Sequence, residues 1–195
     1  MAAAGRREPA PRTKHVDGAR LSNAAAALGL PFAALTTDVG VDAVSFGGTK
    51  NGLLFGEVAV FLSDAADDEL IPFARKQLMQ LASKMRFVSA QFGALLGEDD
   101  LWLRSARHAN GMAVLLAEGV GALEGAEVVH PVEANGVFVR LPAPAIATLL
   151  AELPGEHPFY VWDEAEGVVR WMCSWDTTAN DVEQLLGATR AALIR

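Results

Sequence analysis

The chain has 195 residues, of which 51% are hydrophobic, and a formal net charge of −8 at pH 7. This length suits one large domain or two small ones with a substantial core. The acidic balance argues against nucleic acid, whose phosphates bind clustered Lys and Arg, and no apolar run reaches the roughly 18 residues that a membrane span needs. An anionic small substrate remains compatible with this charge, because a local Arg can outweigh the overall field.

The cysteine count and the first residues bear on the cellular compartment. Cys173 is the only cysteine, which excludes an intrachain disulfide and fits the reducing cytosol, so we expect a cytoplasmic protein. Residues 1–14 carry four cations, one acid and two prolines, and they lack the apolar core of a signal peptide. We expect them to form a disordered tail.

The sequence up to Gly125 predicts a few strands and several helices. Apolar and β-branched residues predict strands over 41–46 and 55–62, and His15-Val16-Asp17 is expected to end a neighbouring strand. Helical propensity and periodicity predict the following segments: a helix over 21–30, a short turn or helix over 31–35, a helix start among the acids of 64–69, one long helix over 71–96 and a second over 101–123.

The pattern changes after Gly125. Short apolar runs predict four strands, over 127–132, 136–141, 159–162 and 168–174. Two further helices are predicted over 143–153 and 178–193, the second capped by Asp176 or Thr177. This order of elements is typical of a small α+β layer.

Lys50 lies in the segment Gly47-Gly48-Thr49-Lys50-Asn51-Gly52, directly after a predicted strand. Small neighbours leave room for a flat ring beside the lysine amine, which is the setting in which a lysine condenses with an aldehyde cofactor. The alternative is a simple β-hairpin, because Asn51-Gly52 is a strong signal for a two-residue turn. This segment taken alone favours the hairpin.

Asp17 favours a cofactor site at Lys50 over a simple hairpin. A carboxylate at a strand end can keep the ring nitrogen of pyridoxal phosphate protonated, which makes the ring an electron sink. Lys50 and Asp17 together therefore suggest a pyridoxal phosphate site. The alternative is that Asp17 is the N-cap of the following helix.

Two arginines are candidates for binding a substrate carboxylate through paired hydrogen bonds. Arg20 follows Asp17 by one helical turn; the alternative for it is an exposed first-turn residue. Arg170 is a lone cation in an otherwise apolar strand, where it is either exposed at a sheet edge or paired with an anion.

The remaining reactive side chains give weaker signals. His108, His130 and His157 lie far apart and lack metal-ligand spacing, so we predict no metal site. Cys173 is expected to be a small buried apolar group rather than a nucleophile. For the tryptophans near the last strands we predict core packing; these are Trp162, Trp171 and Trp175.

Four ordered segments together resemble the low-specificity L-threonine aldolases, which belong to the β-eliminating lyase group of fold type I pyridoxal phosphate enzymes. The segments are His15–Arg20, Val44–Gly52, Ser83–Phe87 and Asp100–Asn110. The resemblance implies an α/β chain: a tail over 1–14, a remnant of the cofactor-binding large domain with its connecting helix over 15–95, and the second long helix with a small α+β C-terminal domain over 96–195.

The resemblance also implies roles for individual residues. Lys50 matches the lysine that forms the Schiff base with pyridoxal 5'-phosphate, and Asp17 matches the aspartate that faces the pyridine nitrogen. Arg20 and Arg170 resemble the arginines that bind the substrate carboxylate. Arg86, and with a weaker match Lys84, resemble basic residues that reach the cofactor region of a neighbouring subunit. The family cleaves L-threonine or L-allo-threonine, which are β-hydroxy-α-amino acids, to glycine and acetaldehyde, and the full-length form is expected to be a homodimer or homotetramer.

The sequence departs from the family pattern before Asp17. Family members carry a phosphate-binding loop and several strands there, whereas only sixteen residues precede Asp17. We therefore expect a chain truncated at its N-terminal side, with an open sheet edge, weak cofactor affinity and little or no aldolase activity. Two alternatives remain: a non-catalytic remnant that only folds or dimerises, and another β-eliminating lyase or aminotransferase-like enzyme.

Overall fold

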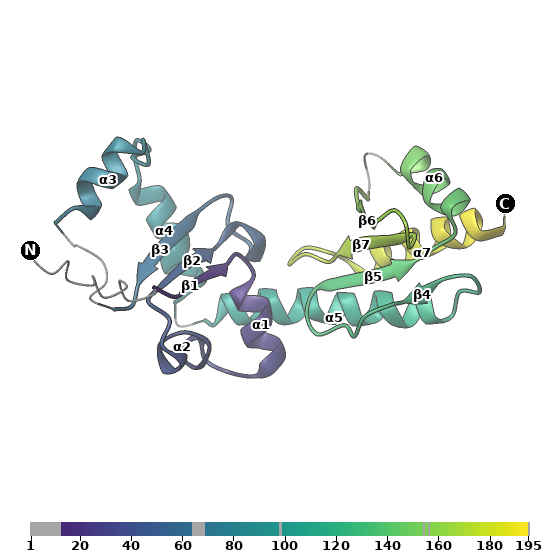
Figure 1. Ribbon diagram of the computed structural model, residues 1–195, viewed down its shortest axis with the longest axis horizontal. Helices are drawn as coiled ribbons and strands as arrows, with labels where there is room; N and C mark the ends of the chain where they lie inside the picture. Colours follow the sequence, from purple (N-terminus) through teal and green to yellow (C-terminus); the bar gives the residue numbers. More distant parts are fainter. Residues whose placement is uncertain (1–12, 64–68, 98, 154, 156, 195) are drawn as a thin grey trace, which may run out of the picture.

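The computed structural model describes residues 13–63, 69–97, 99–153, 155 and 157–194. Two lobes, each built on its own β-sheet, lie side by side and are joined by one long helix that runs along both (Figure 1). Most of the tail expected over 1–14, and residues 64–68 of the expected helix start, lie outside the described residues. None of the described helices combines the length and the apolar character needed to cross a bilayer.

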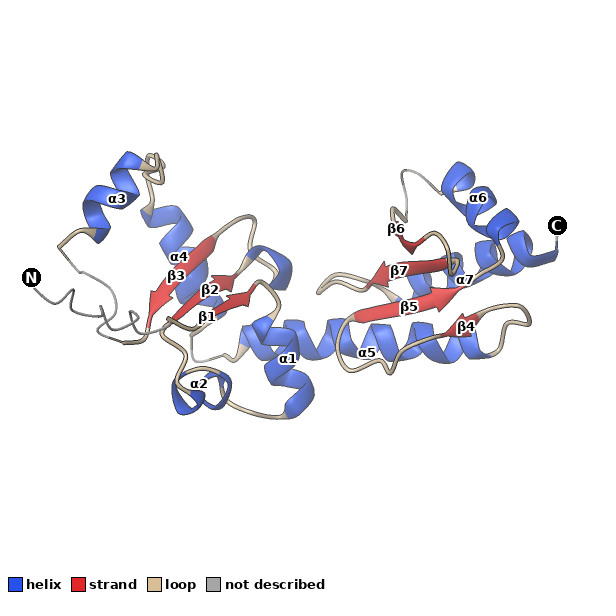
Figure 2. Ribbon diagram, viewed as in Figure 1, coloured by secondary structure: helices blue, strands red, loops and turns tan. Residues whose placement is uncertain are grey.

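The first lobe contains a three-stranded sheet in the order β1-β2-β3 (Figure 2). The strands are β1 (His15–Gly18), β2 (Ala43–Gly47) and β3 (Glu57–Phe61), which confirms the strands predicted in this region. β1 and β2 are parallel, whereas β2 and β3 form an antiparallel hairpin. The crossover between β1 and β2 consists of α1 (Leu21–Leu28), α2 (Phe32–Leu35) and the 3-10 turn η1 (Thr37–Val39).

The core of the first lobe is small and partly open. Its buried residues are Leu21, Val41, Val44 and Phe46. An apolar cavity of about 310 Å³ opens beside them and is lined in part by Val58, Val60 and Phe92. Leu54 and Phe61 are exposed on the hairpin, in accord with the expected uncovered apolar surface.

The prediction of one long helix over 71–96 is wrong. The structure has two helices here, α3 (Ile71–Gln77) and α4 (Arg86–Leu95), separated by turns in which Met79 and Lys84 have positive φ angles of 57° and 60°. Leu78 and Met79 are 68% and 88% exposed. The apolar residues between the two helices are therefore exposed, and packing does not hold the segment in one helix.

The second long helix is confirmed as α5 (Leu101–Gly121), which connects the two lobes. Its first part packs against α1 and the turn that carries Lys50, and its later part packs against β4, β5 and α7. The buried stripe along it consists mostly of small side chains, which permit close approach: Ala106, Ala109, Ala113, Leu116 and Val120.

The second lobe is the predicted α+β layer. An antiparallel sheet has the order β4-β5-β7-β6, and its strands are β4 (Glu127–Val128), β5 (Gly136–Arg140), β6 (Tyr160–Asp163) and β7 (Val168–Met172). α6 (Ala143–Glu152) and α7 (Ala179–Ile194) complete the lobe. The strands expected over 127–132 and 168–174 are shorter than predicted, because the paired residues end at Val128 and Met172.

Alternate residues of β7 face opposite sides of this sheet. Val169 and Trp171 belong to the core that α5, α6 and α7 cover, together with Val137 and Val139 of β5. Arg170 therefore lies on the other face, in register with Phe138 on β5 and Tyr160 on β6.

Candidate functional site

Asp17 and the turn that bears Lys50 lie at the same edge of the first sheet. β1 and β2 are parallel and pair Asp17 with Ser45, so their C-terminal ends, Gly18 and Gly47, point the same way. The turn after β1 rests directly on the end of β2, since a Cβ at Gly47 would lie 2.7 Å from the Ala19 Cα. The structure thus brings the two sequence segments together, at a strand end where open α/β sheets commonly bind ligands.

The carboxylate of Asp17 closes a local turn. Its Oδ1 atom accepts a hydrogen bond from the Ala19 N–H at 3.1 Å, while the side chain remains exposed. The N-cap of α1 is Arg20, not Asp17, so the alternative role as a helix cap is wrong. Asp17 is therefore held in place with its carboxylate available at the strand end.

Lys50 is exposed in the 3-10 turn η2 (Thr49–Asn51), inside the loop of residues 48–56 that joins β2 to β3. The hairpin is therefore real, but the two-residue Asn51-Gly52 turn is not. The hydroxyl of Thr49 accepts a hydrogen bond from the Gly56 N–H at 2.9 Å and closes the loop.

Asn51 and Gly52 fix this loop against the rest of the molecule. Asn51 is 2% exposed, and its Nδ2 donates to the Trp102 carbonyl of α5 at 3.0 Å. A Cβ at Gly52, where φ is 111°, would lie 3.6 Å from the Trp175 ring. Both lobes therefore contribute to the surroundings of Lys50.

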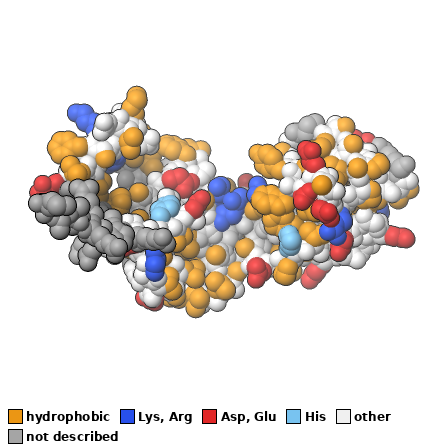
Figure 3. Space-filling view, in the orientation of Figure 1, with side chains coloured by type: hydrophobic (Ala, Val, Ile, Leu, Met, Phe, Trp, Pro, Cys, Tyr) orange, Lys and Arg blue, Asp and Glu red, His pale blue; other side chains and the backbone are white. Residues whose placement is uncertain are grey.

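Arg20 and Arg170 come from different lobes and lie within electrostatic range of each other. Burial, and then the positive charge of Arg170, lower the pKa of Arg20, whereas the Asp17 carboxylate acts in the opposite direction. No carboxylate of the described residues forms an ion pair with either arginine. The ion pairs found among these residues involve only Arg140. Figure 3 shows Lys and Arg side chains gathered on the surface where the two lobes meet.

These positions exclude one of the two alternatives for each arginine, the exposed one. Arg20 is a half-buried N-cap residue rather than an exposed residue of the first turn. Arg170 lies on a central strand of its sheet and not at an edge. Its Nε atom is buried and has no hydrogen-bond partner among the described residues.

Arg86 and Lys84 are not brought to this edge by any described contact. Arg86 begins α4, and its guanidinium carbon lies 4.6 Å from the ring centre of the adjacent Phe87. Lys84 is an exposed turn residue with a positive φ angle. The expectation that they serve a neighbouring subunit stays a prediction.

The tryptophans differ from the sequence-based expectation. Only Trp171 is a core residue; Trp162 and Trp175 are 56% and 44% exposed, so core packing was the wrong prediction for them. Trp175 packs beside the Lys50 loop and Trp162 lies against Arg170, whose guanidinium carbon is 4.9 Å from its ring centre.

Other side chains have structural positions. Burial raises the pKa of the Cys173 thiol to about 11, in accord with an apolar rather than nucleophilic role. His108 contacts the Thr177 carbonyl at 2.7 Å and so links α5 to the loop between β7 and α7. Within the described part of the chain, no group of three or more His, Cys, Asp or Glu side chains could hold a metal ion.

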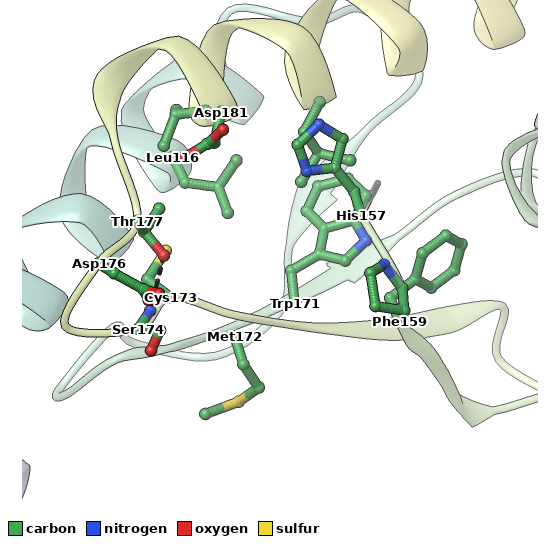
Figure 4. Close-up of a pocket in the computed structure, with 13 residues that line it drawn as sticks. Leu116, His157, Phe159, Trp171, Met172, Cys173, Ser174, Asp176, Thr177 and Asp181 are labelled. Carbon is green, nitrogen blue, oxygen red and sulfur yellow. Dashed lines mark hydrogen bonds between the residues drawn. The ribbon is translucent and has the colours of Figure 1, made fainter. Parts of the chain in front are cut away.

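A larger cavity of about 530 Å³ lies on the opposite side of β7 from Arg170 (Figure 4). Trp171 and His157 line one side of it, and Leu116, Thr177 and Asp181 line the other. None of the five residues predicted as site residues lines it; these are Asp17, Arg20, Lys50, Arg86 and Arg170. The predicted chemistry and this cavity are therefore separate features.

Comparison with known proteins finds similarity over most of the chain. A model of the β-eliminating lyase family matches residues 12–143. Over 172 residues the chain is 49% identical to a low specificity L-threonine aldolase of Pseudomonas aeruginosa, and over 179 residues it is 45% identical to one of Pseudomonas sp. (strain NCIMB 10558). These matches cover 88% and 92% of this chain, but 48% and 50% of the relatives. The chain thus spans about half the length of the curated relatives it matches.

The fold is also similar to a solved structure. The threonine aldolase of Leishmania major superposes with a TM-score of 0.73 at 28% identity, over 92% of this chain and 51% of that one. The predicted α/β fold class and the resemblance drawn from the four sequence segments are therefore confirmed.

Proposed function

The chain belongs to the β-eliminating lyase family, and from that premise we propose that it supplies the lysine and the carboxylate-binding arginines of a pyridoxal phosphate-dependent threonine aldolase. The proposed reaction cleaves L-threonine or L-allo-threonine to glycine and acetaldehyde. The similarity to proteins named low specificity L-threonine aldolase supports this substrate class.

The residues at the edge of the first sheet fit pyridoxal phosphate in chemistry. Lys50 offers an exposed amine for the aldehyde carbon, and Asp17 offers a fixed carboxylate for the ring nitrogen. When bound, the cofactor would accept the electron pair that remains on the substrate Cα after the Cα–Cβ bond breaks. Asp17 favours that chemistry because a carboxylate beside the ring nitrogen keeps its proton in place.

The observation that carries the proposal is the pair of arginines. Two guanidinium groups from different lobes lie within range of each other, and no described carboxylate pairs with either. Like charges repel, so this arrangement gains most from an anion bound between them. A substrate carboxylate is planar and matches the donors of a guanidinium in two parallel hydrogen bonds.

In this proposal the described residues would supply three contacts, to the cofactor aldehyde, the ring nitrogen and the substrate carboxylate. A phosphate group needs several further donors, such as a helix N-terminus or a glycine-rich loop. We therefore expect the 195-residue chain alone to bind pyridoxal phosphate weakly and to show little or no turnover of L-allo-threonine.

The proposal is tested by mapping which lysine reacts with the cofactor. The chain has four lysines, Lys14, Lys50, Lys76 and Lys84, so the other three are internal controls. Limiting pyridoxal phosphate is added, the product is fixed with borohydride, and peptides are quantified by mass spectrometry. We expect modification at Lys50 to exceed that at each other lysine. In the Asp17→Asn variant, this excess at Lys50 should be lost. Equal labelling of all four lysines would contradict the proposal.

A chain that only folds or dimerises is the second candidate. The observation in its favour is the exposed apolar surface of α3 and the following turns, where Phe73 is 70% and Met79 is 88% exposed. Such a patch is typical of a subunit interface, and Arg86 follows it directly. We propose that this surface contributes to a homodimer or homotetramer of the full-length form; light scattering of the purified chain measures its mass in solution.

The third candidate is another β-eliminating lyase or an aminotransferase-like enzyme. Product analysis with L-allo-threonine distinguishes it, because an aldolase releases glycine and acetaldehyde, whereas amino transfer yields a keto acid. We place the protein in the cytosol, on the basis of its single buried cysteine.

A further inference from the structure

Trp162 lies against the guanidinium group of Arg170 on the open face of the second sheet. The guanidinium carbon is 4.9 Å from the centre of the Trp162 ring and 5.8 Å from that of Tyr160. Both distances are within the range in which the electron-rich face of an aromatic ring attracts a cation. Both rings belong to β6, which pairs with the strand of Arg170.

A β-bulge sets the direction of Trp162. Val161 pairs with Val169 and Asp163 with the next residue, Val168, so Trp162 is the extra residue between the two pairs. Bulges of this kind change the direction of a side chain and recur next to active sites. The direction of the Trp162 side chain is therefore set by the backbone register of β6 and not by incidental packing of an exposed ring.

The structure around the bulge holds it in place. The Oδ1 atom of Asp163 accepts hydrogen bonds from the N–H groups of Ala165 and Glu166, both at 3.0 Å, which closes the turn to β7. Phe138 packs edge-on against the Trp162 ring at a centroid distance of 5.2 Å and an angle of 76°. Phe138 is itself the partner of Arg170 on β5, so these side chains form one continuous group.

The position of Arg170 favours an aromatic neighbour that can stabilise its positive charge. It lies near the positive charge of Arg20, and among the described residues its buried Nε atom has no hydrogen-bond partner and no carboxylate pairs with its guanidinium. A guanidinium in that position would otherwise turn away from Arg20 into solvent. The faces of Trp162 and Tyr160 offset part of the repulsion without occupying the hydrogen-bond donors.

We infer that Trp162 is a positioning residue, which holds the Arg170 guanidinium where it binds the substrate carboxylate together with Arg20. The inference rests on the proposed function for the identity of the ligand. Trp162 itself acts through Arg170, so its removal is expected to weaken carboxylate binding without abolishing it, by about two- to tenfold, as for an aromatic–cation contact.

The test uses NMR of the arginine side-chain N–H groups in the full chain. Glycine, the amino acid product, is titrated into wild type, Trp162→Leu and Trp162→Phe, and the Arg170 Nε–H signal is followed. In wild type this signal should carry a ring-current shift and respond to glycine together with Arg20. Trp162→Leu should lose the shift and bind glycine more weakly, and Trp162→Phe should retain most of both.

A matched control removes a different exposed indole of similar exposure. Trp175→Leu should leave the ring-current shift of Arg170 in place, because Trp175 lies beside Gly52 instead. If glycine affects Arg170 equally in wild type and Trp162→Leu, the inference is wrong and the proposed function stands. If Arg170 of the wild type does not respond to glycine at all, the carboxylate site of the proposed function fails, and the role of Trp162 fails with it.

Discussion

Gly47 is in such close contact with Ala19 that a methyl group has no room between them: a Cβ at position 47 would lie 2.7 Å from the Ala19 Cα and 2.8 Å from its carbonyl oxygen. This contact joins the segment of Asp17 to the segment of Lys50. We predict that Gly47→Ala lowers the free energy of unfolding by about 1–3 kcal/mol, because both nearest atoms belong to the backbone and cannot rotate away. Urea denaturation measures the change.

The control for this variant is Gly111→Ala in α5, where no atom lies within 4 Å of the added Cβ. Alanine favours a helix over glycine by about 0.5–1 kcal/mol, so this variant should be slightly more stable than wild type. A Gly47→Ala protein as stable as wild type would show that the two segments can separate without cost.

Asn51 anchors the loop of Lys50 to α5. Asn51→Ala removes the hydrogen bond from Nδ2 to the Trp102 carbonyl at 3.0 Å. We predict a loss of about 1–2 kcal/mol in the free energy of unfolding, the usual effect of removing one partner of a buried hydrogen bond. Labelling of Lys50 by pyridoxal phosphate should also lose its excess over the other lysines. The exposed Asn180 of α7 provides the comparison, since Asn180→Ala should change neither measurement.

Asp17→Asn isolates the charge of the carboxylate from its structural contact. An asparagine Oδ1 can still accept the hydrogen bond from the Ala19 N–H, so the turn should persist and the denaturation midpoint should stay near that of wild type. Cofactor affinity, measured by equilibrium dialysis, should fall about tenfold or more, because a hydrogen bond to a charged group contributes about 1.5–3 kcal/mol. Asp38→Asn, an exposed change outside the site, should leave the affinity as it is.

Thr178 and Asp181 form a reciprocal cap at the start of α7. The backbone N–H of Thr178, and then its hydroxyl, donate to the Asp181 carboxylate and lower its pKa below the ordinary value of 3.8. A carboxyl group whose pKa is lower in the folded state stabilises that state when ionised. Its contribution is therefore complete above the unfolded pKa and is lost as the pH falls through the folded pKa.

We accordingly predict that Asp181→Ala is less stable than wild type at neutral pH, and that the difference shrinks as the pH falls below 3.8. Thermal unfolding at a series of acidic pH values measures this convergence. Glu183→Ala removes a neighbouring exposed acid of the same helix and is the control for the loss of one negative charge at neutral pH. A difference between Asp181→Ala and wild type that is constant with pH would contradict the assignment.

Cys173 should react slowly with thiol reagents in the folded protein. Burial raises its pKa to about 11, and the thiolate is the reactive form. We predict slow modification by a disulfide reagent at pH 8 and rapid modification after addition of urea. Fast modification of the native protein at pH 8 would mean that the region around β7 opens readily.

Sequence patterns predicted correctly those elements whose apolar residues pack against a neighbouring element. The small apolar stripe of α5 faces real partners, so its helix was found with nearly correct bounds. The single helix expected over 71–96 was wrong because Leu78, Met79 and Leu81 in its middle are exposed, and turns at Met79 and Lys84 interrupt it there. Periodicity indicates a helix only where something packs against the apolar face.

The candidate site shows a similar division. Arg170 was recognisable as a lone cation in an apolar strand, and Asp17 and Lys50 were recognisable from their neighbours. The proximity of Arg20 and Arg170 depends on how two lobes join, which no local pattern encodes. Trp162 was assigned to the core because the sequence alternation carries no sign of the bulge that turns its ring to the open face.

The single helix α5 has a consequence for ligand selection. It spans 21 residues and packs against α1 near Arg20 and against β5 and α7 in the lobe of Arg170. An unbroken helix resists bending, so the two lobes cannot approach or separate as hinged domains do without losing packing along it. We therefore expect the gap between the two guanidinium groups to vary little, so that ligands are distinguished by whether their acidic group fits that span rather than by closure of the protein around them.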